Sequence, residues 1–145
     1  MWQSSSKDFG RTRTEPELYL PNKLHHPDLE RNGLDEAFSG ERRHPVFVAD
    51  LPSRTLSLTI GHLGKGESTR KHRHTYETIL YILEGVGRSF IEDRVVEWKE
   101  GDAVYIPMWA WHNHENTGSQ RCRYIACENA PLLQNIGGVA LREEQ

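Results

Sequence analysis

Four of the eight histidines stand in two His-x-His pairs, His72-Arg73-His74 and His112-Asn113-His114. In a β-strand, residues i and i+2 point to the same face, with Cα atoms roughly 6–7 Å apart. Two imidazoles placed in this way can reach one ion at metal–nitrogen distances of about 2.0–2.1 Å. Imidazole is largely neutral near pH 7, and its lone pair suits borderline transition metals. Two such pairs, each bracketed by glycines, therefore predict a site for one divalent metal ion.

Short β-strands are the elements that must hold these histidines. Runs rich in β-branched and aromatic residues, separated by turn residues, predict strands at 46–48, 55–60, 78–83, 87–92, 94–98, 103–106 and 123–126. No helical pattern of ten residues lies between these runs. The arrangement is typical of an all-β sandwich or barrel.

The two ends of the chain differ from this central region. Residues 1–45 are rich in charge, Pro and Gly and lack a sustained periodicity, with one helical turn expected at 35–38. We expect an N-terminal arm here that packs on the barrel or on a partner subunit, with part of the first dozen residues disordered. Residues 46–130 would then form the barrel. Residues 131–145 would form a C-terminal tail in which 131–136, ahead of Gly137-Gly138, make a short helix.

Composition limits the partners of the protein. The 145 residues fit one domain. A net charge of −3 provides no broad basic field for nucleic acid or an anionic membrane. No apolar run approaches the ~18 residues that span a bilayer. A small-molecule ligand or a second copy of the chain is therefore the expected partner.

The strand at 78–83 and the two cysteines carry further expectations. The run Thr78 to Leu83 is apolar on both alternating faces, which predicts cover from the barrel interior on one side and from the arm or a second subunit on the other. A homodimer is therefore expected. Cys122 and Cys127 form no CxxC pair, and the amino end carries no signal-peptide pattern, so we interpret both as reduced core thiols of a cytoplasmic protein.

The residues around the histidine pairs resemble the two motifs of the cupin superfamily. The first motif appears as Gly66, five residues, His72-Arg73-His74, and later Gly85; the second appears as Gly101, five residues, Pro107, then His112 and Asn116. The resemblance covers residues from about 55 to 128. It implies a double-stranded β-helix, the jelly-roll barrel of cupins, with the metal held inside it.

The resemblance also implies the ligand set. His72, His74 and His112 stand at the family's metal-binding positions, whereas Thr78 stands where the family has its metal-binding Glu. Glu77 has the opposite strand parity to the two histidines, so it could reach the ion as a fourth ligand only through a β-bulge. Both a three-histidine site and a site that includes Glu77 stay open at this point.

The histidine segments are similar to those of gentisate and salicylate 1,2-dioxygenases. Those enzymes hold Fe(II) on three histidines and cleave aromatic rings, and they are usually bicupins well over twice this length. The similarity implies His114 as an inner-face residue near the substrate. His114 is thus either a proton-handling catalytic residue or a hydrogen-bonded core histidine. Tyr76 is the second candidate catalytic residue, because it is expected in the pocket.

The expected substrate pocket includes Trp109, Trp111 and Thr78. The two indoles could stack on an aromatic substrate or fill the barrel mouth. Arg70, Lys71 and Arg73 form a basic cluster that is interpreted as a solvated face rather than an anion-binding site.

Three functions remain compatible with the sequence. The first is a mononuclear metal-dependent oxidoreductase of dioxygenase type acting on a small anionic aromatic, keto or hydroxy acid, because a three-histidine site keeps the full charge of the ion. The second is a non-oxidative isomerase or lyase, and the third is a non-catalytic binding or sensing protein. Fe(II) or Mn(II) is the favoured metal, and Ni(II), Cu(II) and Zn(II) also suit imidazole ligands.

Overall fold

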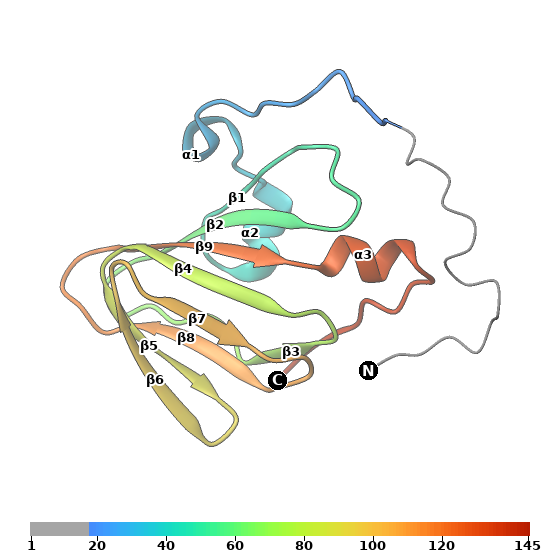
Figure 1. The fold of residues 1–145 in the computed structure, drawn as a ribbon. Helices are drawn as coiled ribbons and strands as arrows, with labels where there is room; N and C mark the ends of the chain where they lie inside the picture. The colour runs from blue at the N-terminus through green and yellow to red at the C-terminus, as the bar shows by residue number, and fades with distance from the viewer. Residues whose placement is uncertain (1–17) are drawn as a thin grey trace.

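The computed structural model describes residues 18–145 and shows a mostly β architecture (Figure 1). The prediction of disorder in the first dozen residues lies outside the described residues. The helices are α1 (Leu29–Asn32), α2 (Glu36–Arg42) and α3 (Ala130–Asn135). The strands are β1 (Val46–Val48), β2 (Ser57–Leu63), β3 (His72–His74), β4 (Thr78–Glu84), β5 (Val86–Ile91), β6 (Arg94–Lys99), β7 (Ala103–Ile106), β8 (His112–Asn116), β9 (Cys122–Glu128) and β10 (Arg142–Glu144).

The strands form two five-stranded antiparallel sheets that enclose the core. One has the order β1-β2-β9-β4-β7, and the other has the order β10-β3-β8-β5-β6. Buried and exposed residues alternate along β4 and β7, so one face of each strand turns to the interior. The core contains Leu63, Ile82, Ile106 and Cys122, each with no exposed surface. The predicted all-β jelly-roll with a short C-terminal helix is confirmed.

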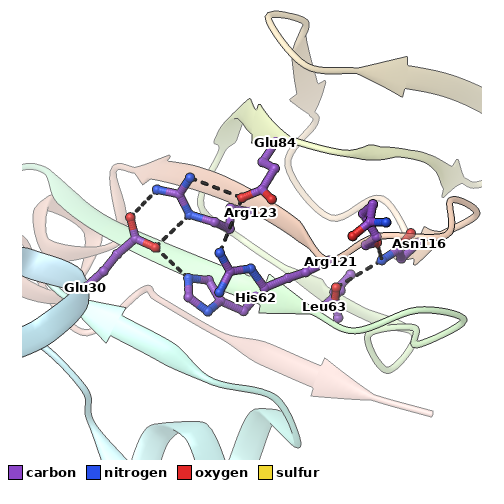
Figure 2. A network of polar contacts seen from close by, with 8 residues as sticks. Glu30, His62, Leu63, Glu84, Asn116, Arg121 and Arg123 are labelled. Carbon is purple, nitrogen blue, oxygen red and sulfur yellow. Dashed lines mark hydrogen bonds and ion pairs between the residues drawn. The ribbon is translucent and has the colours of Figure 1, made fainter.

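The turn between β4 and β5 depends on a glycine. Gly85 has a φ of 94°, a left-handed conformation that side chains disfavour, and a Cβ there would lie 2.7 Å from the Cys122 sulfur. This turn connects the two sheets at the end of the barrel. At the same end, the Asn116 amide donates to the Leu63 carbonyl at 3.0 Å and ties β8 to β2 (Figure 2).

Helices α1 and α2 lie beside β1, at the edge of the sheet that contains β2 and β9. The Asp35 carboxylate accepts a hydrogen bond from the Phe38 N–H at 2.8 Å and caps α2, which runs four residues beyond the predicted turn. The Glu30 carboxylate of α1 pairs with Arg123 of β9 and lies 2.6 Å from the His62 ring (Figure 2). This ion-pair network connects α1 to the outer surface of the barrel.

One of the two alternatives for the cover of β4 is not seen in the described residues, and the expectation that both cysteines lie in the core is wrong. Ile79 and Tyr81, on the outer face of β4, are 53% and 45% exposed, so the described part of the arm does not cover them. Cover by a second subunit stays a prediction. Cys122 is buried, but Cys127 is exposed, because the odd spacing places the two thiols on opposite faces of β9. Within residues 18–145, no helix combines the length and apolar character needed to cross a bilayer.

Candidate metal centre

β3 and β8 bring three of the predicted histidines together. The two strands pair at His72 and His112, and His74 lies on the same face of β3 as His72. One ring nitrogen of each residue lies within 4.8 Å of the others, and the His72 and His112 ring centroids are 4.1 Å apart. His74 and His112 are almost fully buried. The three imidazoles are placed where they could hold one metal ion.

Backbone carbonyls determine which ring nitrogen of each histidine is free. The Nδ1 of each ring donates a hydrogen bond to a carbonyl two positions away in the chain. The three acceptors are Arg70 at 2.7 Å for His72, Tyr76 at 2.7 Å for His74 and Ala110 at 2.8 Å for His112. A carbonyl oxygen can only accept, so Nδ1 carries the proton and Nε2 keeps its lone pair. Hydrogen bonding of this kind commonly orients metal-binding histidines.

Burial keeps these imidazoles neutral. It is the largest cause that lowers the pKa of His74 to about 4 and the pKa of His112 to about 3, with the neighbouring His72 acting in the same direction. Burial also lowers the pKa of His72. At pH 7 all three rings are therefore neutral, with the proton on Nδ1 alone, which is the form that binds a metal through Nε2.

His114 lies on the same face of β8 as His112 but outside the three-nitrogen group. Its Nδ1 is 2.7 Å from the Ser89 hydroxyl, which accepts a hydrogen bond from the Trp98 indole at 2.9 Å. Because the indole donates to this oxygen, the hydroxyl hydrogen is available to His114. Complete burial holds the pKa of His114 well below its usual value. Its ring is thus a neutral, firmly held part of the interior.

A small cavity of about 80 Å³, partly open to solvent, extends from the imidazoles into the barrel. Tyr76, Thr78 and His114 line it. The Tyr76 ring stacks on His74 with a centroid distance of 3.9 Å and an interplanar angle of 1°. Burial raises the pKa of the Tyr76 hydroxyl, which therefore keeps its proton near pH 7.

The structure does not bring Glu77 to the imidazoles. Its carboxylate is exposed and accepts a hydrogen bond from the Tyr105 hydroxyl at 2.5 Å on the outside of the barrel. The next residue, Thr78, faces the cavity instead. The pairing of β4 with β7 is regular from Thr78 to Tyr81, so this pairing contains no β-bulge at the start of β4.

Trp109 and Trp111 also lie apart from the cavity lining in the described chain. Their rings enclose the Arg73 guanidinium, which is 4.3 Å from one ring centroid and 4.6 Å from the other. Arg73 belongs to β3 and pairs with Glu143 of β10. Trp109 adopts a left-handed φ of 63°, and its N–H donates to the His74 carbonyl at 2.8 Å. The indoles thus hold the loop before His112 against β3.

Sequence reasoning missed the cavity residues supplied by the two ends of the chain. Arg42 and His44 come from the segment before β1, and Arg142 and Glu144 come from β10. The spacing of Arg142 and Glu144 gave a weak signal, because residues i and i+2 share a strand face. Arg42 and His44 had no local pattern. Glu128, at the end of β9, was missed as well, and burial raises the pKa of its carboxyl.

Comparison with known proteins agrees with this geometry. Residues 59–127 match the cupin domain family. The chain is 39% identical over 98 residues to an uncharacterized protein of Methanocaldococcus jannaschii, covering 67% of this chain and 76% of that protein. It is 33% identical to a dimethylsulfoniopropionate lyase of Ruegeria pomeroyi, covering 66% of this chain and 68% of the lyase.

Other similar proteins are larger dioxygenases. The chain is 31% identical over 83 residues to a 5-aminosalicylate 1,2-dioxygenase of a Comamonas species, covering 57% of this chain but 22% of that enzyme. The fold superposes on a salicylate 1,2-dioxygenase of Pseudaminobacter salicylatoxidans with a TM-score of 0.69 and 24% identity, over 81% of this chain and 36% of the other. The chain therefore spans about a quarter to a third of the length of these dioxygenases.

Proposed function

This chain belongs to the cupin domain family, and we propose that it is a mononuclear metal-dependent dioxygenase acting on a small anionic substrate. His72, His74 and His112 would hold one divalent ion, and Fe(II) or Mn(II) is the proposed metal. The substrate class is an aromatic, keto or hydroxy acid. When bound, such an ion supplies Lewis acidity and redox chemistry with oxygen.

The observation that carries the proposal is the common tautomer of the three histidines. Each Nδ1 donates to a backbone carbonyl, so each Nε2 keeps its lone pair for a metal, and the group of three histidines includes no carboxylate. A ligand set of three neutral imidazoles leaves the full charge of a divalent ion in place. Such a site favours anionic substrates that chelate the ion.

The chain's own residues would position the substrate and handle its protons. Tyr76 keeps its hydroxyl proton next to His74 and can donate a hydrogen bond into the cavity. His114 is neutral and buried beside the site, and because its Nδ1 accepts from the Ser89 hydroxyl, we assign its Nε2–H the role of donating a hydrogen bond to the substrate. The names of the dioxygenase relatives, which refer to aromatic acids, support this substrate class.

Metal analysis and oxygen uptake test the proposal. Protein purified without chelators should contain about one equivalent of Fe or Mn, and it should consume one O2 for each molecule of gentisate, salicylate or 5-aminosalicylate converted. His112→Ala should lack both properties, whereas His25→Ala, a change at an exposed histidine before α1, should keep them. A metal-loaded protein that consumes no oxygen with any of these acids would refute the dioxygenase.

A second candidate function is a non-oxidative lyase. The similarity to a dimethylsulfoniopropionate lyase over 68% of that enzyme's length favours it. In this case the ion would polarise a carboxylate or carbonyl, and oxygen would play no part. Product formed from dimethylsulfoniopropionate under anaerobic conditions, at the aerobic rate, would select the lyase over the dioxygenase.

We also propose that the protein forms a homodimer through the outer face of β4. Ile79 and Tyr81 are exposed there, next to Tyr105 of β7. Large apolar side chains gathered on one sheet face are typical of an interface. Ile79→Lys should convert a dimer to a monomer in sedimentation experiments, and a wild-type monomer would refute the proposal.

A further inference from the structure

We infer that Arg42 and Arg142 form an anion subsite at the edge of the cavity, which binds the carboxylate of the ligand. Both residues line the cavity, and both lie outside the matched residues 59–127. Arg42 ends α2, and Arg142 begins β10. The inference deepens the proposed function, since it assigns the residues that recognise the charge of the substrate.

Positive charge exceeds negative charge at this edge. The Glu144 carboxylate pairs with Arg70 at 2.5 Å and also contacts Arg142. A Glu144 carboxylate oxygen lies 3.8 Å from a guanidinium nitrogen of Arg42, which is too long for a hydrogen bond. The Glu144 carboxylate therefore faces three guanidinium groups, each with five N–H donors, and Glu128 is the other carboxyl group that lines the cavity. The arginine donors outnumber the acceptors that Glu144 offers.

One buried N–H donor of Arg142 has no acceptor among the described residues. Its Nε is buried, and within residues 18–145 it has no hydrogen-bond partner. An unsatisfied buried donor costs roughly 1–3 kcal/mol, and it is unusual enough in native proteins to call for an explanation. A ligand oxygen at the cavity edge would satisfy this donor.

The charge of Arg42 reaches into the cavity. The Arg42 guanidinium lies 4.4 Å from the Phe38 ring centroid, and its side chain is only 18% exposed. Arg42 lines the same cavity as His74 and Glu128, which stand on different strands of the cavity wall. Arg42 therefore faces the enclosed space rather than bulk solvent.

Guanidinium chemistry indicates the ligand class. A planar guanidinium fork matches the two oxygens of a carboxylate and binds them through parallel, charge-assisted hydrogen bonds. The cavity is small, about 80 Å³, and partly open to solvent, so the acid that enters it must be small. We therefore assign a monocarboxylic acid whose carboxylate contacts Arg42 and Arg142 and whose remainder extends toward the imidazoles. Inorganic phosphate is also an oxyanion that guanidinium groups bind, so it serves as the competing ligand in the test.

Calorimetric titration with salicylate and with its neutral analogue salicylamide tests the subsite. Arg42→Gln and Arg142→Gln should each weaken salicylate binding about tenfold or more, because charge-assisted hydrogen bonds contribute roughly 1.5–3 kcal/mol and 1.4 kcal/mol corresponds to tenfold. Salicylamide binding should not change. Arg94→Gln removes an exposed arginine of β6 and is the matched control, with unchanged binding of both compounds.

The alternative outcomes are separable. Equal losses for salicylate and salicylamide, or no salicylate binding to wild type at millimolar concentrations, would overturn the subsite. Phosphate that binds more tightly than salicylate through the same arginines would overturn the assignment to a carboxylic acid. Arg42→Lys, which keeps the charge but loses the fork, should bind salicylate with intermediate affinity. Thermal unfolding of each variant checks that the fold is intact.

Repeating the titrations on chelator-treated protein separates this inference from the proposed function. Arginine-dependent binding of salicylate to the chelator-treated protein, together with no oxygen uptake by the metal-loaded protein, would keep the subsite and refute the dioxygenase. Oxygen uptake with salicylate that is unchanged in both Gln variants would keep the dioxygenase and refute the subsite.

Discussion

His72 and His112 are directly paired across β3 and β8, so the register of these two strands determines where two of the three clustered imidazoles lie. A shift of one residue would turn either ring to the other face of its strand. β3 is also paired on its other edge by β10, from Arg142 opposite His74 to Glu144 opposite His72. The position of the candidate metal centre therefore depends on strand pairing on both sides of β3.

Loss of one clustered imidazole should abolish metal binding. His72→Ala leaves two nitrogens, and we expect the metal content to fall from about one equivalent to nearly zero. Its ring is partly buried, so the fold should remain, as circular dichroism can check. His26→Ala, a change outside the cluster, is the matched control. Full metal occupancy in His72→Ala would contradict the assignment.

Removing the charge of Glu77 should have little effect on the metal. The Glu77 carboxylate binds the Tyr105 hydroxyl on the outside of the barrel, so Glu77→Gln should change the metal affinity less than about tenfold, or 1.4 kcal/mol. Competition with a chromophoric chelator measures this change. A larger loss would show that the carboxylate reaches the ion in the metal-bound protein.

Removing the Ser89 hydroxyl should destabilise the fold. Its oxygen is completely buried and connects the Trp98 indole to His114. Ser89→Ala leaves the indole donor without its partner, and we expect a loss of roughly 2–3 kcal/mol in the free energy of unfolding. Urea denaturation measures it. Ser57→Ala, at a partly buried hydroxyl of β2, should lose less than about 1 kcal/mol.

The contacts of Glu30 with Arg123 and His62 should make the stability of the fold depend on pH in the acid range. The Arg123 guanidinium, with His62, lowers the pKa of Glu30 from 4.5 to about 2. The folded state therefore binds this proton less readily than the unfolded state. The stabilisation is fully present above pH 4.5 and is lost as the pH falls toward 2.

Glu30→Gln isolates this contribution. The variant should unfold more easily than wild type at pH 6, and the difference between them should shrink as the pH falls from 4.5 toward 2. Free energies of unfolding at a series of pH values measure it, with Glu36→Gln, an exposed acid of α2, as the control. A difference that stays constant over this range would contradict the prediction.

The barrel and its histidines could be predicted because local patterns encode them. Two-residue alternation and regularly placed glycines identify strands, and a His-x-His pair places both rings on one strand face. The same rule fails for Trp109 and Trp111. They lie in the loop before β8, where residues do not alternate between faces, so their contact with Arg73 could not be derived from spacing.

The edge of the cavity could not be predicted, because it depends on contacts between distant parts of the chain. Arg70 and Glu144 are 74 positions apart. β10 consists of Arg142, Glu143 and Glu144, residue types that are not enriched in strands. It becomes a strand because the free edge of β3 presents backbone groups that need partners. Only the folded barrel creates that edge.

The pairing of β10 with β3 also affects the order of events during synthesis. The ribosome makes all three clustered histidines before it makes Glu144. The nascent chain therefore carries the imidazoles before β10 can pair with β3, the strand of His72 and His74. A metal that binds the histidines of an unfolded chain could bind before the barrel is complete. Binding of the proposed metal should therefore follow translation of residue 144, when β10 can pair with β3.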